Sequence, residues 1–388
     1  MSSSFIMPRE IISGKYALES GAAKEIFRRS GKKALIITGP NLMRRGACLP
    51  LENILRTENI NYVFYSDIYG EPNDKMVRAA LETYISNGCD FLVALGGGSP
   101  IDLMKAVGAL VGREGNITDY IGENIDWRVP SMTAIPTTAG TGSEATQFTI
   151  ITDTEKEIKM LLKGRSLMPE YAIVDPEFTV TAPPSVTAAT GLDALCHSIE
   201  AFTSRKAQPL TDTFALSAVK RIFKYLPVCF QNGKNEEARM QMSIASLEAG
   251  IAFNNASVTL IHGMSRPIGA LFHVPHGLSN ALLMEECLTY ALSGAYDRFA
   301  VLGRAVGTSE PDDDSQTASE KFLKGLIGLK EKLNIPSMEE YGIDRERYFD
   351  VIGKMARDAM NSGSPQNTIK DISEEDIIEI YKRAWMKE

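Results

Sequence analysis

The four histidines of this chain lie in two short segments. His197 follows Asp193 by four residues in GLDALCHSIEA, and His262, His273 and His276 lie within IHGMSRPIGALFHVPHG. Residues four apart on a helix project from the same face, so Asp193 and His197 can contact a common ion. Such a pair is often only a capping or surface hydrogen bond, but imidazole is the most common transition-metal ligand. An aspartate with three histidines is a ligand set suited to Fe²⁺ or Zn²⁺.

A glycine-rich segment, LVALGGGSPID (92–102), continues from a run of apolar residues. Gly97 and Gly98 have no side chains, so the backbone there can approach a ligand closely. Ser99 suits the N-cap of the following helix, and Asp102 suits its first turn. The free N–H groups at such a helix start bind pyrophosphate. A tight structural turn is the alternative, because the segment lacks the G-x-G-x-x-G fingerprint.

A second segment, IPTTAGTGSEAT (135–146), places threonine, serine and glycine directly after another apolar run. Small hydroxyl residues and glycines suit contacts to phosphate or ribose. Two such loops in one domain favour a dinucleotide site over a structural turn.

Both loops belong to a pattern of strands and helices that extends to about Thr181. Buried strands are predicted at 32–39, 61–68, 90–97 and 131–138, with helical patterns between them. Strands that alternate with helices predict βαβ units and a mostly parallel sheet.

The later part of the chain is helical in pattern, and strand candidates almost disappear. We therefore predict an α/β dinucleotide-binding domain at 1–181 and an all-helical metal-binding domain at 182–388.

Composition excludes several classes of protein. The net charge is −8 without a basic cluster, which argues against nucleic acid or an anionic membrane as the main partner. The five widely spaced cysteines include no C-x-x-C pair, so a disulfide framework is not expected and a reducing compartment is indicated. The N-terminus does not resemble a signal peptide, and no apolar run is long enough to span a membrane. We expect a cytoplasmic protein.

Several of these segments together resemble a known family. GLDALCHSIEA, AGIAFNNA, HGM and PHG resemble signatures of the iron-containing, or group III, alcohol dehydrogenases. GGGSPID and TTAGTGSE resemble that family's cofactor loops, and the resemblance spans nearly the whole chain. It implies that Asp193, His197, His262 and His276 bind the metal. It also implies an active site in the cleft between the two domains.

The resemblance implies hydride transfer between a nicotinamide cofactor and a primary alcohol or aldehyde. Fe²⁺, or alternatively Zn²⁺, would act as a Lewis acid on the substrate oxygen. Dehydroquinate synthase, a zinc lyase, and glycerol dehydrogenase share the fold and are the alternatives. The scarcity of Lys and Arg around the ligands disfavours the phosphate-bearing substrate of a lyase.

The family's cofactor contacts map onto a further set of positions. NAD-dependent members commonly carry an aspartate after the first strand, where this chain has Gly39, and nearby Asn41 can donate to a 2′-phosphate. We therefore expect NADP(H) to be used at least as well as NAD(H). The remaining contacts that the resemblance implies are Asn73, Gly97, Gly98, Ser99, Asp102, Thr137, Thr138, Thr141 and Lys159.

Arg266 and His273 are the candidate catalytic residues beside the ligands. Arg266 stands where many relatives have a second histidine, four residues after His262. Arginine stays protonated, so it cannot be the general base, and proton transfer falls to water, the cofactor ribose or His273. A guanidinium there favours a substrate with an anionic tail, unless it pairs with a glutamate or caps a helix. The family does not require histidine at position 273, which favours a supporting role for His273.

Assembly is also expected from the resemblance. Family members form dimers and larger assemblies, often through edge strands near the N-terminus. We expect a homodimer or larger homo-oligomer, with residues 5–20 as a contact segment. The expected partner otherwise is a small-molecule alcohol or aldehyde.

Overall fold

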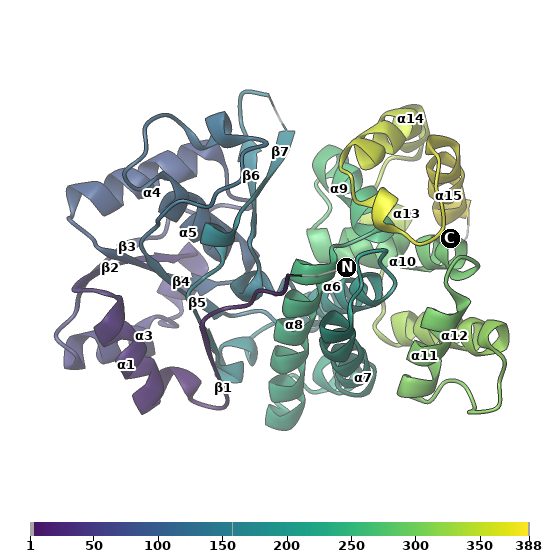
Figure 1. Ribbon diagram of the computed structural model, residues 1–388, viewed down its shortest axis with the longest axis horizontal. Helices are drawn as coiled ribbons and strands as arrows, with labels where there is room; N and C mark the ends of the chain where they lie inside the picture. Colours follow the sequence, from purple (N-terminus) through teal and green to yellow (C-terminus); the bar gives the residue numbers. More distant parts are fainter. Residues whose placement is uncertain (1–3, 157, 387–388) are drawn as a thin grey trace. The chain divides into compact units, whose positions relative to one another are not determined.

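The computed structural model describes residues 4–156 and 158–386. Ile6–Thr181 forms one compact unit, and the chain from Ala182 onwards forms the other. Every described strand lies in the first unit, and the second is helical (Figure 1). Phe5 belongs with the helical unit, where its ring stacks on that of Phe214 with the centroids 5.9 Å apart. The predicted fold class, a parallel α/β domain plus an all-helical domain, is confirmed.

A six-stranded sheet with the order β1-β8-β5-β4-β2-β3 forms the centre of the α/β unit. Each strand pairs in parallel with its neighbours, so crossover connections are required. Helices lie in the connections from β2 to β3 and from β4 to β5, whereas the described residues between β5 and β8 contain no α-helix. The strands are β1 (Glu10–Ser13), β2 (Lys33–Thr38), β3 (Asn61–Tyr65), β4 (Phe91–Gly96), β5 (Ser131–Pro136) and β8 (Tyr171–Val174). The helices are α1 (Gly21–Ser30), α2 (Pro40–Arg44), α3 (Leu49–Thr57), α4 (Asp74–Ser86) and α5 (Gly98–Leu110).

Helices cover both faces of this sheet, as Figure 1 shows for α1 and α3 on one side and α4 and α5 on the other. On β2, Leu35 and Ile37 pack into the core formed with α4 and α5. Ala34 and Ile36 pack into the core formed with α1 and α3. Successive side chains of a strand point to opposite faces, so a strand covered on both sides is apolar throughout.

Four strands were not predicted. β1 and β8 are only four residues long each, and β6 (Phe148–Asp153) pairs with β7 (Ile158–Lys163) in a separate antiparallel hairpin. The hairpin alternates buried and more exposed residues, a weaker signal than an unbroken apolar run. The predicted N-cap was also wrong. Helix α5 begins at Gly98 with Gly97 as its N-cap, so Ser99 lies in the first turn.

The helical unit is built around α6 (Pro184–Phe202), which is buried along most of its length and packs against α7, α8 and α10. The other helices are α7 (Pro209–Gln231), α8 (Glu236–Ala256), α9 (Leu260–Phe272), α10 (His276–Leu292), α11 (Tyr296–Val306), α12 (Ser315–Lys332), α13 (Met338–Tyr341), α14 (Arg345–Asn361) and α15 (Glu374–Met386). In the described chain, no helix by itself has the length and apolarity to cross a membrane. Only α8 and α9 taken together have them, and these two are bent by 104°.

A buried ammonium group holds part of the α/β unit together. Lys105 on α5 is 0% exposed, and its Nζ donates to Ser143 Oγ at 3.0 Å, Thr146 Oγ1 at 2.8 Å and the Phe148 carbonyl at 2.8 Å. One turn earlier, Asp102 accepts a hydrogen bond from Ser143 Oγ at 2.6 Å. These bonds attach the end of the threonine-rich loop after β5 (137–146) to α5. Burial lowers the pKa of Lys105 to about 8, although the nearby carboxylates oppose the shift.

Glu144, next to Ser143, is a buried carboxyl group in the same cluster. Its Oε2 has no hydrogen-bond partner among the described residues. Burial raises its pKa from 4.5 to about 7, against opposing effects of its own backbone N–H and of Lys105. A carboxyl whose pKa is raised on folding stabilises the fold while it is protonated. That contribution is therefore present below about pH 4.5 and is lost as the pH rises through about 7.

We predict that Glu144→Gln raises the midpoint of thermal unfolding at about pH 8 and gives no gain at about pH 4.5. The amide cannot ionise, so the variant avoids a cost on the order of 3 kcal/mol for the buried charge. Calorimetry on nucleotide-free protein measures both midpoints. Glu82→Gln, at an exposed position of α4, is the control and should change neither. A midpoint at pH 8 no higher than that of wild type would contradict the prediction.

Candidate metal centre and nucleotide-binding loops

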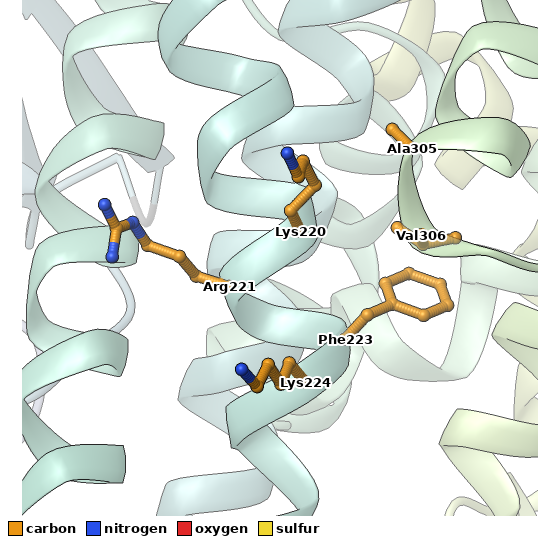
Figure 2. Close-up of a pocket in the computed structure, with 6 residues that line it drawn as sticks. All are labelled: Lys220, Arg221, Phe223, Lys224, Ala305 and Val306. Carbon is orange, nitrogen blue, oxygen red and sulfur yellow. The ribbon is translucent and has the colours of Figure 1, made fainter.

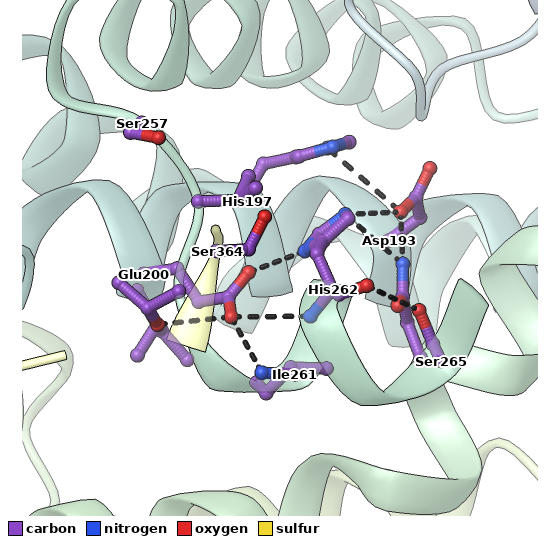
Figure 3. A network of polar contacts seen from close by, with 12 residues as sticks. Asp193, His197, Glu200, Ser257, Ile261, His262, Ser265 and Ser364 are labelled. Carbon is purple, nitrogen blue, oxygen red and sulfur yellow. Dashed lines mark hydrogen bonds and ion pairs between the residues drawn. The ribbon is translucent and has the colours of Figure 1, made fainter. Parts of the chain in front are cut away.

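Four side chains in the helical unit present ligand atoms to a common point. Asp193 and His197 come from α6, His262 from α9 and His276 from the first residue of α10. One ligand atom from each lies within 4.8 Å of all the others. The structure therefore brings together the complete predicted ligand set, and Figure 3 shows three of its members, Asp193, His197 and His262.

Asp193 is the negative centre of this cluster. Its Oδ1 lies 3.8 Å from His197 Nδ1, 3.5 Å from His262 Nε2 and 3.6 Å from His276 Nε2. Burial alone would raise the pKa of Asp193, but the three imidazoles hold it well below its usual value. The carboxylate therefore stays ionised, as metal ligation requires.

The imidazole rings of His197 and His262 are fixed by packing and by carboxylates. The His197 ring stacks between Phe253, at a centroid distance of 4.1 Å, and His262, at 4.3 Å. Phe253 belongs to the AGIAFNNA segment of α8, which accounts for its place in the site. Burial alone would lower the pKa of His262, but Glu200 and Asp193 raise it to about 9. Ligation at neutral pH therefore displaces a proton from His262.

The contacts of Asn280 show that the donor set fits a cation. Asn280 lies one turn after His276 on α10, and its Nδ2 is 2.7 Å from Asp193 Oδ1, 3.1 Å from His262 Nε2 and 3.4 Å from His276 Nε2. Its buried Oδ1 has no hydrogen-bond partner among the described residues. Three of the four ligand atoms therefore lie within hydrogen-bonding distance of one amide NH₂ group, so they can also face one cation. Their oxygen and nitrogen chemistry suits a divalent transition metal.

The close approach of α10 to α6 explains the glycine that follows His276. A Cβ on Gly277 would lie 2.5 Å from the Ala189 carbonyl oxygen and 3.3 Å from Asp193 Cβ. A larger residue would therefore separate the helix that carries His276 from the helix that carries Asp193.

In the α/β unit, the predicted nucleotide residues lie at the carboxyl ends of three adjacent strands. Gly39 follows β2, Gly97 follows β4 and Thr137 follows β5, and these strands are neighbours in the sheet. Along the chain, β2 is followed by β3, which lies on one side of it in the sheet. The next strand, β4, lies on the other side of β2 and is followed outwards by β5, so the strand order reverses between β2 and β4. Ligands of open parallel sheets bind at such a switch point.

The glycine and threonine loops pack directly against each other. A Cβ on Gly97 would lie 3.2 Å from Thr138 Oγ1, and one on Gly98 would lie 3.1 Å from Thr141 Cγ2. Thr137 donates its backbone N–H to the Gly96 carbonyl at 3.0 Å. Six of the predicted cofactor residues therefore lie in these two packed loops or, for Asp102, are bonded to one of them through Ser143, and Ser99 lies in the first turn of α5.

The other predicted cofactor residues lie beside this surface or serve local structure. Asn73 caps α4 by accepting the Met76 N–H at 2.9 Å, and its backbone pairs with Thr152 on β6. Thr152 in turn pairs with Lys159, whose Nζ lies 2.7 Å from Glu71. Asn73 and Lys159 are therefore close, but both side chains have protein partners. Asn41 is exposed on α2 and accepts a hydrogen bond from Arg44.

Arg266 and His273 lie at different points of α9. Arg266 is half-buried one turn after His262, and its Nη1 donates to Ser364 Oγ at 3.0 Å. Among the described residues, no carboxylate lies within ion-pair distance of the guanidinium, so pairing with a glutamate is not observed. Burial lowers its pKa, and the charge of Glu200 opposes the shift. His273 is exposed and ends α9 in the left-handed region, at φ 55°.

Sequence reasoning missed Glu200, Asn280 and Phe253 in the metal centre and Lys105 beside the loops. Glu200 follows Asp193 by seven residues and Asn280 follows His276 by four, so helical spacing from the ligands would have identified both. Lys105 follows Asp102 by three residues on α5, so the same spacing rule applies to it. Phe253 comes from another helix, and only the tertiary packing reveals its contact with His197.

A shallow hollow elsewhere on the helical unit contains none of these residues. Figure 2 shows that basic side chains of α7 line it beside Ala305 and Val306. Arg221 in this group already pairs with Glu248 at 3.1 Å, and Lys220 and Lys224 are exposed. No chemistry is assigned to it.

We predict that Asp193→Ala abolishes bound metal while the helical unit stays folded, because removal of the only anionic ligand leaves three neutral imidazoles. Elemental analysis of the purified variant measures metal content, and circular dichroism measures the fold. Asp358→Ala, at an exposed position of α14, is the control and should keep the metal of wild type. Full metal occupancy in Asp193→Ala would show that the ligand assignment is wrong.

Comparison with known proteins gives consistent results over both units. Residues 8–176 match the model of the iron-containing alcohol dehydrogenases, and residues 187–385 match that of the Fe-containing alcohol dehydrogenase family, C-terminal. The NAD-dependent methanol dehydrogenase of Bacillus methanolicus is 34% identical, over 99% of this chain and 100% of the relative.

Two solved structures extend the comparison to the fold. The crystal structure of 1,3-propanediol oxidoreductase is 31% identical, with a TM-score of 0.94, over 99% of this chain and 100% of that one. Sulfoacetaldehyde reductase from Bifidobacterium kashiwanohense, in complex with NAD⁺, is 26% identical, with a TM-score of 0.88 over 100% of both chains. Together with the four converging ligands, these matches show that the chain belongs to the iron-containing alcohol dehydrogenase family, as an NAD(P)-dependent enzyme that interconverts alcohols and aldehydes.

Proposed function

We propose that this enzyme interconverts an aldehyde bearing an acid group and the corresponding primary alcohol, with NADP(H) used at least as well as NAD(H). The observation that supports the substrate class is Arg266. Its guanidinium is half-buried one turn from a metal ligand and has a neutral hydroxyl as its hydrogen-bond partner. Among the described residues it makes no direct ion pair, and the charge of Glu200 acts on it only from beyond ion-pair distance. A carboxylate or sulfonate on the substrate would supply a direct counter-charge.

The family relationship is compatible with this substrate class. Sulfoacetaldehyde, the substrate in the name of the Bifidobacterium kashiwanohense reductase, is an aldehyde with an anionic tail. Methanol, the substrate in the name of the Bacillus methanolicus enzyme, has no tail. Family membership alone therefore leaves the choice open, and the arginine is what favours an anion.

The residues of the metal centre would have different roles in the reaction. A divalent ion held by Asp193, His197, His262 and His276 would act as a Lewis acid towards the substrate oxygen. Arg266 would orient the far end of the substrate, but as a permanent cation it cannot accept the proton. Proton transfer would then fall to water, to the cofactor ribose or to His273, whose exposed position leaves its imidazole open to solvent.

A metal-dependent lyase or a polyol dehydrogenase on the same fold is the alternative. The lyase would use the nucleotide only transiently, so it would show no net change in the absorbance of the reduced cofactor. Incubation of the metal-loaded protein with NADPH and succinic semialdehyde tests this directly. Sustained oxidation of NADPH, lost on metal removal and regained on adding Fe²⁺ back, is expected. No oxidation of NADPH with any aldehyde would contradict the proposed reaction. In the direction of alcohol oxidation, a faster reaction with glycerol than with primary alcohols that bear an acid group would favour the polyol dehydrogenase.

We predict that Arg266→Met lowers kcat/KM for succinic semialdehyde by about 10- to 100-fold, the worth of a hydrogen bond to a charged group. The value for butanal, which has no anion to bind, should change little. Arg221→Met, at a half-buried arginine of α7 that already pairs with Glu248, is the control and should affect neither substrate. A preference for butanal that Arg266→Met leaves unaltered would contradict the proposal.

The cofactor proposal depends on the turn after β2. Nothing lies within 4 Å of a Cβ built on Gly39, so the turn has open space. Asn41 and Arg44 are exposed beside it, and the Arg44 guanidinium is drawn back towards the turn by its hydrogen bond to Asn41. A ribose 2′-phosphate would meet one cation there and no carboxylate in the turn itself, whereas an aspartate at position 39 would repel it.

We predict that Arg44→Ala weakens binding of NADP⁺ by about 5- to 10-fold and leaves NAD⁺ unchanged, as expected for loss of one exposed contact to a phosphate. Arg45→Ala is the matched control, because the structure gives that neighbouring side chain no bond to Asn41. Gly39→Asp should reverse the preference towards NAD⁺. Dissociation constants from calorimetry test all three variants, and a strong preference of wild type for NAD⁺ would contradict the proposal.

A further inference from the structure

Glu200 is a buried carboxylate that the metal-ligand set does not include. It lies on α6, seven residues after Asp193 and three after His197, so all three side chains share one face of the helix. Its side chain is 0% exposed. Figure 3 shows His262 between Glu200 on one side and Asp193 on the other.

One oxygen of Glu200 caps α9. Its Oε1 accepts hydrogen bonds from Thr259 Oγ1 at 2.9 Å, from the Ile261 N–H at 2.7 Å and from the His262 N–H at 3.3 Å. Thr259, the N-cap residue itself, makes no side-chain cap bond. The first N–H groups of a helix lack partners within the helix, so Glu200 provides from α6 the acceptor that α9 needs.

The other oxygen of Glu200 faces the ring of His262. Its Oε2 contacts His262 Nδ1. A carboxylate only accepts hydrogen bonds, so the proton of the neutral imidazole must lie on Nδ1. The lone pair is then on Nε2, the atom 3.5 Å from Asp193 Oδ1 and 3.1 Å from Asn280 Nδ2. The Asn280 amide is a donor, which independently fits an unprotonated Nε2.

We propose that Glu200 is a positioning residue that selects the tautomer of His262 able to bind the metal, in addition to capping α9. A metal-bound histidine usually donates its other ring N–H to a carboxylate or carbonyl, which fixes the ring and strengthens the ligand. The same carboxylate here also fixes where α9 begins and therefore where His262 stands. The proposal rests on the metal centre and is independent of the proposed substrate and cofactor.

Glu200→Gln tests the proposal with almost no change in shape. Glutamine keeps an oxygen that can cap α9, but it places an NH₂ group opposite His262 Nδ1. Two donors cannot face each other, so the imidazole must carry its proton on Nε2, where it blocks the metal. We expect the dissociation constant for Zn²⁺ or Fe²⁺, measured by competition with a chelator, to rise about 10- to 100-fold. The unfolding midpoint of the metal-free protein should stay close to that of wild type.

Two further variants distinguish an effect on the His262 tautomer from an effect on the cap of α9 and from the loss of a negative charge alone. Thr259→Val removes one hydrogen bond to Oε1 and leaves the contact of Oε2 with His262, so it should lower stability and hardly alter metal affinity. Glu248→Gln makes the same substitution at a carboxylate of α8 that pairs with Arg221 outside the ligand set, and it should leave metal affinity unchanged. Affinities are measured at about pH 7 and about pH 9, because protons compete with the metal at His262 at the lower pH.

A loss of affinity in Glu200→Gln at both pH values, with the metal-free fold retained, would support the proposal. Unchanged affinity would overturn it and leave Glu200 as a helix cap. Equal losses of affinity in Glu200→Gln and Thr259→Val, each with a lowered unfolding midpoint, would also overturn it, because the effect would then be structural.

Discussion

A buried carboxylate in contact with three imidazoles, two of them also buried, is the constraint on which the helical unit depends. Asp193 is 2% exposed at its side chain, and such a charge is tolerated only with close partners of opposite or complementary polarity. Those partners come from three helices, so α6, α9 and α10 must converge to within side-chain length. The glycine after His276 permits the approach of α10, and the Glu200 carboxylate determines the start of α9.

The α/β unit meets a comparable constraint by different means. Three strand ends leave backbone and small side chains at one edge of the sheet, and these must keep a fixed shape to recognise a nucleotide. Lys105 and Asp102 on α5 hold the loop after β5 in place through hydrogen bonds to Ser143, Thr146 and the backbone. A buried ammonium is costly to desolvate, so the retention of Lys105 beside the loop fits a role in shaping it.

The sequence predicted what is encoded by local pattern. Unbroken apolar runs identified the central strands, because β2, β4 and β5 are covered on both faces, and helical spacing put Asp193 and His197 together. Short or one-sided strands such as β1 and the β6–β7 hairpin carry too little pattern to be recognised. Glu200 and Lys105 could have been found by helical spacing from Asp193 and Asp102, whereas Phe253 reaches the site only through tertiary packing. The partner of Arg266 was also beyond sequence reasoning, since Ser364 lies 98 residues away.

Asp193, His197, His262 and His276 are the groups around which the active site is organised. X-ray absorption spectroscopy on the protein loaded with Fe²⁺ or Zn²⁺ measures the atoms around the ion directly. A first shell of nitrogen and oxygen with the outer-shell scattering of three imidazoles, and without sulfur, is the predicted result. Scattering from sulfur, or from fewer than three imidazoles, would contradict the account.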